Sequence, residues 1–275
     1  MADSNPYEEH TIIGRGGARR LHADIYRPKR RNGAGVLMIH GGGWRMGSKG
    51  MMPPQAQALA NRGFTCLATE YRLRPRHPWP AQIHDVKTAI RWFRANADAL
   101  DVDPTRIAVL GNSAGGHLAL LLAGTVGLSE FEGDGGNPGT DTTVAAVIAV
   151  YPPVEFYVGD RTSGGTAASA LLGENADPDA ARAASPMTYV REDFPPTFFL
   201  HGNGDTVVPV SASIKMYNAL CDAGARAEMH IYAEQPHTWA RWPKWVQPTM
   251  DEAAVFLERY VVNPASYGRP SRLPA

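Results

Sequence analysis

The chain has 275 residues, of which 44% are hydrophobic and 20% are charged, and its 27 basic and 27 acidic residues cancel. This composition is typical of a globular protein and excludes the strong uniform charge that attracts nucleic acid or anionic membranes. We therefore expect neither nucleic acid nor a membrane among its partners.

Short apolar runs alternate with longer helical patterns along the chain. In order, we expect an edge strand over residues 21–26, a buried strand over 36–40, a helix over 55–62, a strand over 65–70, an amphipathic helix over 80–96, a strand over 107–110, a helix over 114–123, strands over 144–150 and 197–201, a helix over 210–223, a strand over 227–232 and a helix over 249–261. This alternation predicts an α/β fold with a mostly parallel central sheet and helices on both faces.

Two segments interrupt the alternation. Residues 124–143 are rich in glycine and acidic residues and are predicted to form a surface loop. Residues 154–196, which we call the insertion, are weakly patterned, with a short helix expected near 167–172. A long insertion in a domain is often functional, and this one could form a small lid. Because no linker divides the chain, we expect one domain over residues 1–275.

Ser113 lies in the stretch Gly111-Asn112-Ser113-Ala114-Gly115, which fits the pattern G-x-S-x-G between a predicted strand and a predicted helix. In a nucleophile elbow the serine needs small neighbours because it sits on a strained turn. The alternative is an ordinary strand–helix turn that contains a serine. The strand and helix on either side favour a nucleophilic serine.

The stretch HGGGW, residues 40–44, follows another buried strand, and we call it the glycine loop. Consecutive glycines indicate a backbone that approaches something closely. Free amide groups in such a loop can bind the oxyanion of a tetrahedral intermediate, together with the amide after the nucleophile. The residue after the nucleophile is Ala114. A merely flexible turn would not account for the position of the loop at a strand end.

Asp205 and His237 each follow a predicted strand of their own. Alone, the aspartate could be a helix cap and the histidine structural. The order Ser113, Asp205, His237 is, however, that of a hydrolase triad, and the carboxyl ends of parallel strands meet in one crevice. The sequence therefore predicts a catalytic triad.

Other polar residues are expected to be structural. His40 and His201 begin glycine turns and are predicted to brace loops, and His117 lies one turn into the helix after Ser113. Asp85 is expected on the polar side of its helix, in an ion pair. Because no metal-binding or nucleotide-binding motif occurs, we expect neither a metal nor a nucleotide cofactor.

Cellular context is predicted from three features. Cys66 and Cys221 lie in apolar contexts typical of buried thiols, which favours a reducing compartment. The first residues have no signal-peptide pattern, and no apolar run approaches the length of a membrane span. A cytoplasmic protein is therefore expected.

These motifs resemble the serine esterases of the α/β-hydrolase fold that carry HGGGW and GxSAGG, close to the feruloyl-esterase-like and hormone-sensitive-lipase-like carboxylesterases. The resemblance runs from about residue 21 to residue 262 and includes the segment 201–209. The chain departs from the family in having Pro236 and Thr238 around His237, where glycines are common. The N-terminal region is short, so a reduced cap is expected.

The resemblance implies hydrolysis of a small-molecule carboxylic ester without a cofactor, through an acyl-enzyme on Ser113. It also implies that the amides of Gly42, Gly43 and Ala114 bind the oxyanion. Trp44 and Trp239 are expected to bind substrate and to close a shallow pocket for short acyl chains, although aromatic residues at such places are often core. Two alternatives stay open: an aryl-formamidase-type amidohydrolase with the same triad, and a non-catalytic binding member of the fold. A homodimer is also left open.

Overall fold

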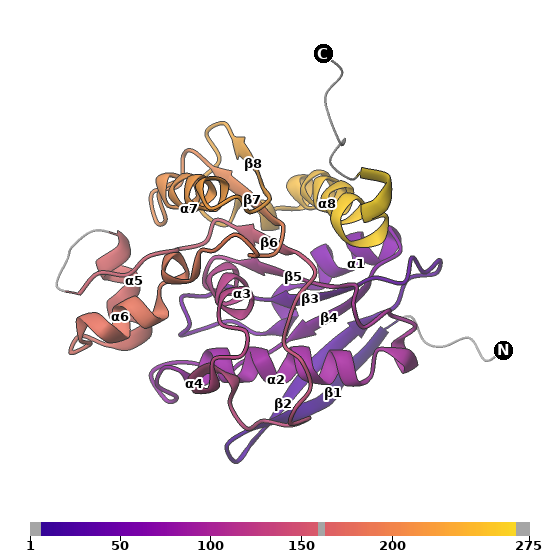
Figure 1. The fold of residues 1–275 in the computed structure, drawn as a ribbon, viewed down its shortest axis with the longest axis horizontal. Coiled ribbons are helices and arrows are strands. Elements are labelled where there is room, and N and C mark those ends of the chain that lie inside the picture. The colour runs from indigo at the N-terminus through magenta and orange to yellow at the C-terminus, as the bar shows by residue number, and fades with distance from the viewer. Residues whose placement is uncertain (1–6, 159–162, 268–275) are drawn as a thin grey trace.

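The computed structural model describes residues 7–158 and 163–267, which are built around one eight-stranded sheet (Figure 1). The strand order is β1-β2-β4-β3-β5-β6-β7-β8. The two N-terminal strands run antiparallel to their neighbours, and the six strands from β4 to β8 are parallel. The strands are β1 (Tyr7–Gly16), β2 (Arg19–Tyr26), β3 (Gly35–Ile39), β4 (Thr65–Thr69), β5 (Ile107–Asn112), β6 (Val147–Val150), β7 (Thr197–Gly202) and β8 (Ala227–Tyr232).

Helices cover both faces of this sheet, as predicted. On one face lie α1 (Pro53–Asn61) and α8 (Pro243–Leu257), and on the other lie α2 (Ala81–Ala95), α3 (Ala114–Gly124) and α7 (Ser211–Asp222) (Figure 1). Successive side chains of a strand point to opposite faces, so β3 sends Leu37 and Ile39 towards α2 and α3 and Val36 towards α1. The continuous apolar runs of the central strands follow from this double burial.

Two of the larger differences from the predictions concern the place of residues 21–26 in the sheet and the start of α8. Residues 21–26 are not at the sheet edge, because β1 pairs with β2 on the outer side. Most of β1 is polar and partly exposed, and two irregularities interrupt its pairing, so it has no clear apolar alternation. Helix α8 begins at Pro243 rather than at residue 249, since burial of Val246 and Met250 outweighs the presence of Pro248.

The predicted surface loop over residues 124–143 is anchored to α2 by buried charges. The Lys87 ammonium is fully buried and donates to the Thr125 carbonyl and to the Glu132 carboxylate, each at 2.6 Å. Arg91 also binds this carboxylate, at 3.2 Å. Burial lowers the pKa of Lys87, although the hydrogen bond to Glu132 opposes the shift. A short helix, α4 (Ser129–Glu132), presents the carboxylate, so this segment is part of the packed structure.

The burial of two side chains also differs from expectation. Asp85 forms the predicted ion pair, with Arg72 at 2.8 Å, but it is buried rather than on the polar side of α2. Burial raises the pKa of Asp85 and the hydrogen bond from Arg72 opposes that rise. Cys66 is buried as predicted, whereas Cys221 is exposed because it lies on the outer side of α7.

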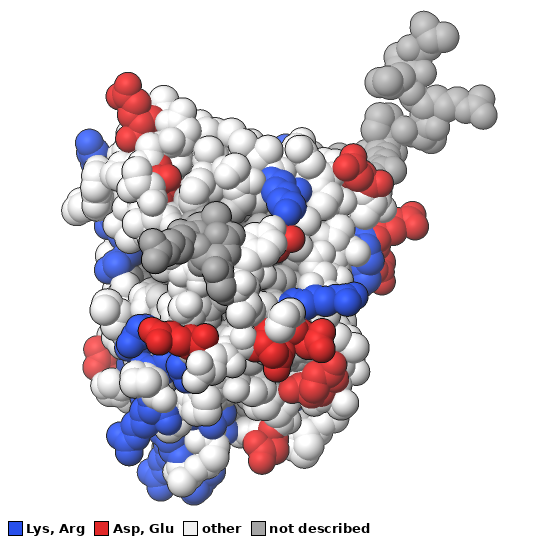
Figure 2. Space-filling model, turned by 90° about the vertical axis from the view of Figure 1, so that its left-hand side faces the viewer, with Lys and Arg blue, Asp and Glu red and all other residues white. Residues whose placement is uncertain are grey.

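The surface carries charges of both signs. On the face drawn in Figure 2, side chains of both signs are scattered, with a group of basic side chains at the lower left and a group of acidic side chains to the right of it. No helix within residues 7–158 and 163–267 has the length and apolar character that crossing a membrane requires.

Candidate active site

Ser113 occupies a strained turn between β5 and α3. Its φ and ψ are 53° and −118°, a conformation that residues with a side chain rarely adopt. A Cβ atom at Gly111 would lie 2.1 Å from the Gly115 carbonyl oxygen, and one at Gly115 would lie 2.2 Å from that of Ile39. The glycines are therefore required where the strand end and the helix start touch, and they hold the serine at the carboxyl end of the sheet.

The three residues predicted to form a triad are brought together. His237 Nε2 lies 2.9 Å from Ser113 Oγ, and His237 Nδ1 lies 2.6 Å from Asp205 Oδ2. Because a carboxylate only accepts, Nδ1 carries the proton and Nε2 is left to accept from the serine hydroxyl. The arrangement can deprotonate Ser113 and stabilise the imidazolium that forms.

Asp205 is buried, and both of its carboxylate oxygens have hydrogen-bonding partners. Its Oδ1 accepts from the backbone amides of Val207 and Val208, each at 2.9 Å, and its Oδ2 also lies 3.3 Å from His201 Nε2. Burial alone would raise the pKa of Asp205, but the hydrogen bonds from His201, His237 and the Val208 amide outweigh it and hold the pKa well below its ordinary value. The carboxylate therefore stays ionised in the neutral range.

Tyr151 contacts the triad and was not identified from the sequence. It follows β6, has a φ of 41° and is fully buried, and its ring centre lies 4.7 Å from that of His237. It limits the positions that the imidazole can take. Its place at the carboxyl end of the strand next to β5 could have drawn attention to it, since that edge carries the other site residues.

The glycine loop passes directly beside Ser113. A Cβ atom at Gly41 would lie 3.3 Å from the Ser113 Cβ, and Gly42 and Gly43 have φ values of 121° and 58°, which favour glycine. Among the described residues, no hydrogen-bond acceptor is found for the amides of Gly42, Gly43 or Ala114. These amides are available to a ligand bound at the serine.

Trp44 and Trp239 are both buried, and a role in substrate binding stays a prediction. Trp44 is 3% exposed and packs against His117 and Phe156, with ring centres 5.1 and 5.7 Å away. Trp239 is 0% exposed and packs between Tyr232 and Trp245. Each ring buries a large apolar area beside a strand end, which is the core role left open above.

Two buried histidines brace the glycine loop. The His40 ring stacks on Tyr71 at 4.3 Å, and His117 accepts a hydrogen bond from the Trp44 indole at 3.2 Å. Burial lowers the pKa of His40 to about 4 and the pKa of His117 to about 3. Both rings are therefore neutral in the folded protein at pH 5 to 7.

We expect these two histidines to lower the free energy of unfolding on acidification, at pH values well above those at which carboxylates titrate. Below about pH 6.5 the unfolded chain binds protons at both rings and the folded chain does not. The free energy of unfolding should therefore fall as the pH falls, by about 1.4 kcal/mol per pH unit for each ring. Urea denaturation at pH 5.0 to 7.5 measures the slope of the free energy of unfolding against pH. His117→Asn should reduce this slope by the contribution of one ring. A free energy of unfolding that is flat over this range would contradict the prediction.

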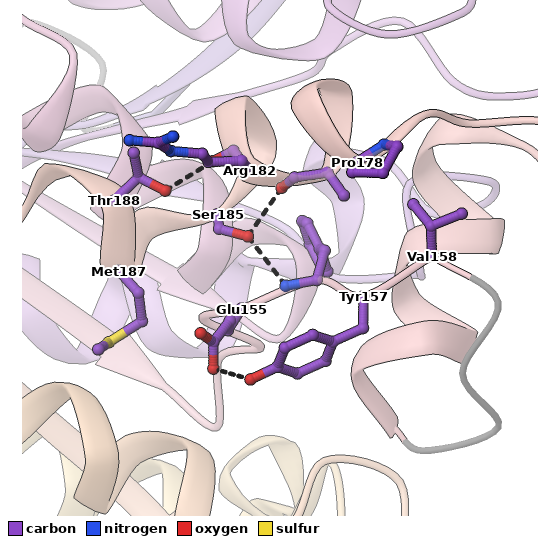
Figure 3. A pocket seen from close by; sticks show the side chains of 10 residues that line it. Glu155, Tyr157, Val158, Pro178, Arg182, Ser185, Met187 and Thr188 are labelled. Atoms are coloured by element: carbon purple, nitrogen blue, oxygen red, sulfur yellow. Dashed lines mark hydrogen bonds between the residues drawn. The ribbon is translucent and has the colours of Figure 1, made fainter.

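The described residues of the insertion, 154–158 and 163–196, include two helices and line a cavity of about 520 Å³. The insertion contains α5 (Ser163–Leu172), α6 (Pro178–Ala184) and a 3₁₀ turn (Pro186–Tyr189), whereas only residues 167–172 were predicted to be helical. The cavity lies between residues 155–158 and α6 (Figure 3), and Ser185 Oγ joins its two sides by donating to the Ala181 carbonyl and accepting from the Phe156 amide. Neither Ser113, Asp205 nor His237 lines it. A role as a lid stays a prediction.

A metal site does not emerge from the described residues. Within residues 7–158 and 163–267, no group of three or more His, Cys, Asp or Glu side chains is placed to hold an ion.

The chain is similar to known proteins over most of its length. The BD-FAE family model matches residues 23–220. Esterase LipQ of Mycobacterium tuberculosis is 35% identical over 243 residues, which cover 82% of this chain and 54% of LipQ. Arylacetamide deacetylase of Bos taurus is 38% identical over 107 residues, covering 36% of this chain and 27% of that protein. The chain spans about half the length of the mycobacterial relatives.

A solved structure resembles the whole chain. The thermophilic esterase 2 of Thermogutta terrifontis, a Planctomycetes species, superposes with a TM-score of 0.79 and 26% identity, covering 98% of this chain and 95% of that one. The same esterase has been solved with propionate and with butyrate bound, and phosphorylated by paraoxon.

Proposed function

This chain belongs to the BD-FAE family and has the α/β-hydrolase fold, and on that premise we propose that it is a serine hydrolase that cleaves short-chain carboxylic esters. One observation carries the proposal: the chain of hydrogen bonds from Ser113 through His237 to Asp205, on a strained serine beside available amides. The named activity of LipQ and the esterase 2 structure support it.

In the proposed acylation step, Ser113 Oγ attacks the ester carbonyl carbon while His237 Nε2 takes the hydroxyl proton. The carbonyl electrons move to the oxygen, and the amides of Gly42, Gly43 and Ala114 bind the resulting oxyanion. Each such donor contributes roughly 3 kcal/mol. The imidazolium then gives its proton to the departing alcohol, and an acyl-serine remains.

In the proposed deacylation step, water replaces the alcohol. His237 Nε2 takes a proton from the water, whose oxygen attacks the acyl carbon, and the same amides bind the second oxyanion. Collapse releases the carboxylic acid and returns the proton to Ser113 Oγ. Asp205 stays ionised throughout and holds the imidazole with its proton on Nδ1.

We expect kcat/KM to be highest on acetyl to butyryl esters and to fall at least tenfold by octanoyl. The support is the propionate- and butyrate-bound structures of esterase 2, since the tryptophans first expected to close the acyl pocket lie in the core. A buried methylene contributes about 0.8 kcal/mol only when it finds a wall to contact. Initial rates on p-nitrophenyl acetate, butyrate, octanoate and palmitate are the measurement. Turnover of palmitate equal to that of butyrate would contradict the short-chain proposal.

An amidohydrolase with the same triad is the second candidate. The similarity to arylacetamide deacetylase over 107 residues favours it. Comparing p-nitroacetanilide with p-nitrophenyl acetate separates amide from ester preference on one aryl group, and N-formylkynurenine tests the aryl-formamidase alternative. A non-catalytic member of the fold would hydrolyse none of these compounds and would not be phosphorylated by paraoxon.

We further propose a cytoplasmic location, supported by two free thiols, one of them exposed on α7. A single domain over residues 1–275 and a homodimer both stay predictions. Light scattering of the full chain measures the oligomeric state directly.

A further inference from the structure

His117 connects three segments that are far apart in the sequence. Its backbone amide donates to the Ser113 carbonyl at 3.0 Å in the first turn of α3. Its ring accepts from the Trp44 indole Nε1 at Nδ1, at 3.2 Å, and donates from Nε2 to the Ala184 carbonyl, at 2.8 Å. Ala184 is the last residue of α6, so its carbonyl has no partner further along that helix.

Each hydrogen-bond partner of the His117 ring is compatible with only one of the two neutral tautomers of that ring. An indole nitrogen can only donate and a backbone carbonyl can only accept, so the ring must carry its proton on Nε2 alone. If the ring were protonated, its Nδ1–H would face the indole N–H of Trp44, and neither group could accept a hydrogen bond. The ring is fully buried, and burial lowers the pKa of His117 to about 3, which keeps it in the tautomer that fits both partners.

Packing adds to these hydrogen bonds. The Phe156 ring lies 4.9 Å from the ring of His117 and 5.7 Å from that of Trp44, and Phe156 also lines the cavity of the insertion. Trp44 follows Gly43 directly in the chain. The position of the indole therefore limits the position of the Gly43 peptide.

We propose that His117 is a positioning residue: it holds the glycine loop through Trp44 and ties that loop to the insertion through Ala184. This inference rests on the proposed function, because its effect is on the amides that bind the oxyanion. The end of α6 is then connected, through His117 and Trp44, to the amides that bind the oxyanion, and the two do not move independently.

Two substitutions of His117 separate its two hydrogen bonds. In His117→Asn the side-chain oxygen replaces Nδ1 and can still accept from Trp44, whereas in His117→Gln the amide nitrogen replaces Nε2 and can still donate to Ala184. We expect kcat on p-nitrophenyl butyrate to fall about tenfold in His117→Gln, which corresponds to about 1.4 kcal/mol, with KM changed less than twofold. The corresponding loss in His117→Asn should be at most half of the loss in His117→Gln, expressed as free energy.

Trp44→Phe removes the same hydrogen bond from the other side. It should lower kcat as much as His117→Gln does, and the double variant should show no further loss. The control is His84→Gln on α2, whose ring bonds to the Glu130 carbonyl away from the serine and whose kcat should stay within twofold of wild type. Equal losses in the two His117 variants, or a Trp44→Phe variant as active as wild type, would overturn the inference.

A readout without turnover separates this inference from the proposed function. In ¹⁵N–¹H spectra the Trp44 indole proton should exchange slowly in wild type and in His117→Asn, and at least tenfold faster in His117→Gln. Equal exchange in all three proteins would overturn the inference in an active enzyme. An inactive wild type that paraoxon does not label would contradict the proposed function instead, whatever the exchange rates.

Discussion

Ser113→Ala is expected to lower kcat on p-nitrophenyl butyrate by about 10⁵- to 10⁶-fold while the protein stays folded. Loss of the nucleophile in a triad costs this much, and the residual rate comes from binding and from the oxyanion donors. Alanine keeps the Cβ and removes only the hydroxyl that contacts His237 at 2.9 Å, so no cavity forms in the core. The measurement is kcat at saturating ester, with the melting temperature as a check on folding.

Labelling supplies the control for this prediction. Paraoxon should add one phosphoryl group to wild type, on the peptide that contains Ser113, and none to the alanine variant. Ser211→Ala, at the exposed start of α7, should be labelled and active like wild type. Labelling of a different serine, or full activity of Ser113→Ala, would show that the nucleophile has been misassigned.

Asp205→Asn is expected to lower kcat by about 10⁴-fold without changing the backbone around the site. The Asn oxygen can keep the hydrogen bonds from the amides of Val207 and Val208, which turns its NH₂ group towards His237. His237 must then accept at Nδ1, so Nε2 carries the proton and cannot take the one on Ser113. Steady-state kinetics at pH 7.5 measure the loss.

The comparison variant is Asp222→Asn, at the exposed end of α7, which removes the same charge outside the site. Its kcat should match that of wild type. If Asp205→Asn kept more than a tenth of the wild-type kcat, the tautomer of His237 would be set by another group and the role proposed for Asp205 would be wrong.

The sequence predicted the triad because its members share one topological property. Ser113, Asp205 and His237 each follow a separate strand, and parallel strands bring their carboxyl ends together whatever the loop lengths between them. The central strands were equally predictable, since burial on both faces gives continuous apolar runs. The fold and the core of the site thus follow from patterns that are local in the sequence.

Features that depend on long-range packing could not be predicted from the sequence. Trp239 is two residues after His237 in the chain, but it packs between Tyr232 and Trp245, and no local sequence pattern indicates that packing. The role of His117 does not follow from the sequence, because the two hydrogen-bond partners of its ring are 73 and 67 residues away. Strand β1 escaped detection because its pairing with β2, rather than any apolar alternation, defines it.

The buried Lys87 has a consequence for the nascent chain on the ribosome. Its counter-charge, Glu132, is 45 residues downstream, so at about 5–20 residues per second α2 waits about 2 to 9 seconds for that carboxylate. Burying the ammonium and the Arg91 guanidinium without it would leave two uncompensated charges, at a cost of several kcal/mol each. We expect α2 to dock late, after β3, β4 and β5 have emerged. The apolar side of this helix then stays open to chaperones, or to aggregation, until residue 132 has been made.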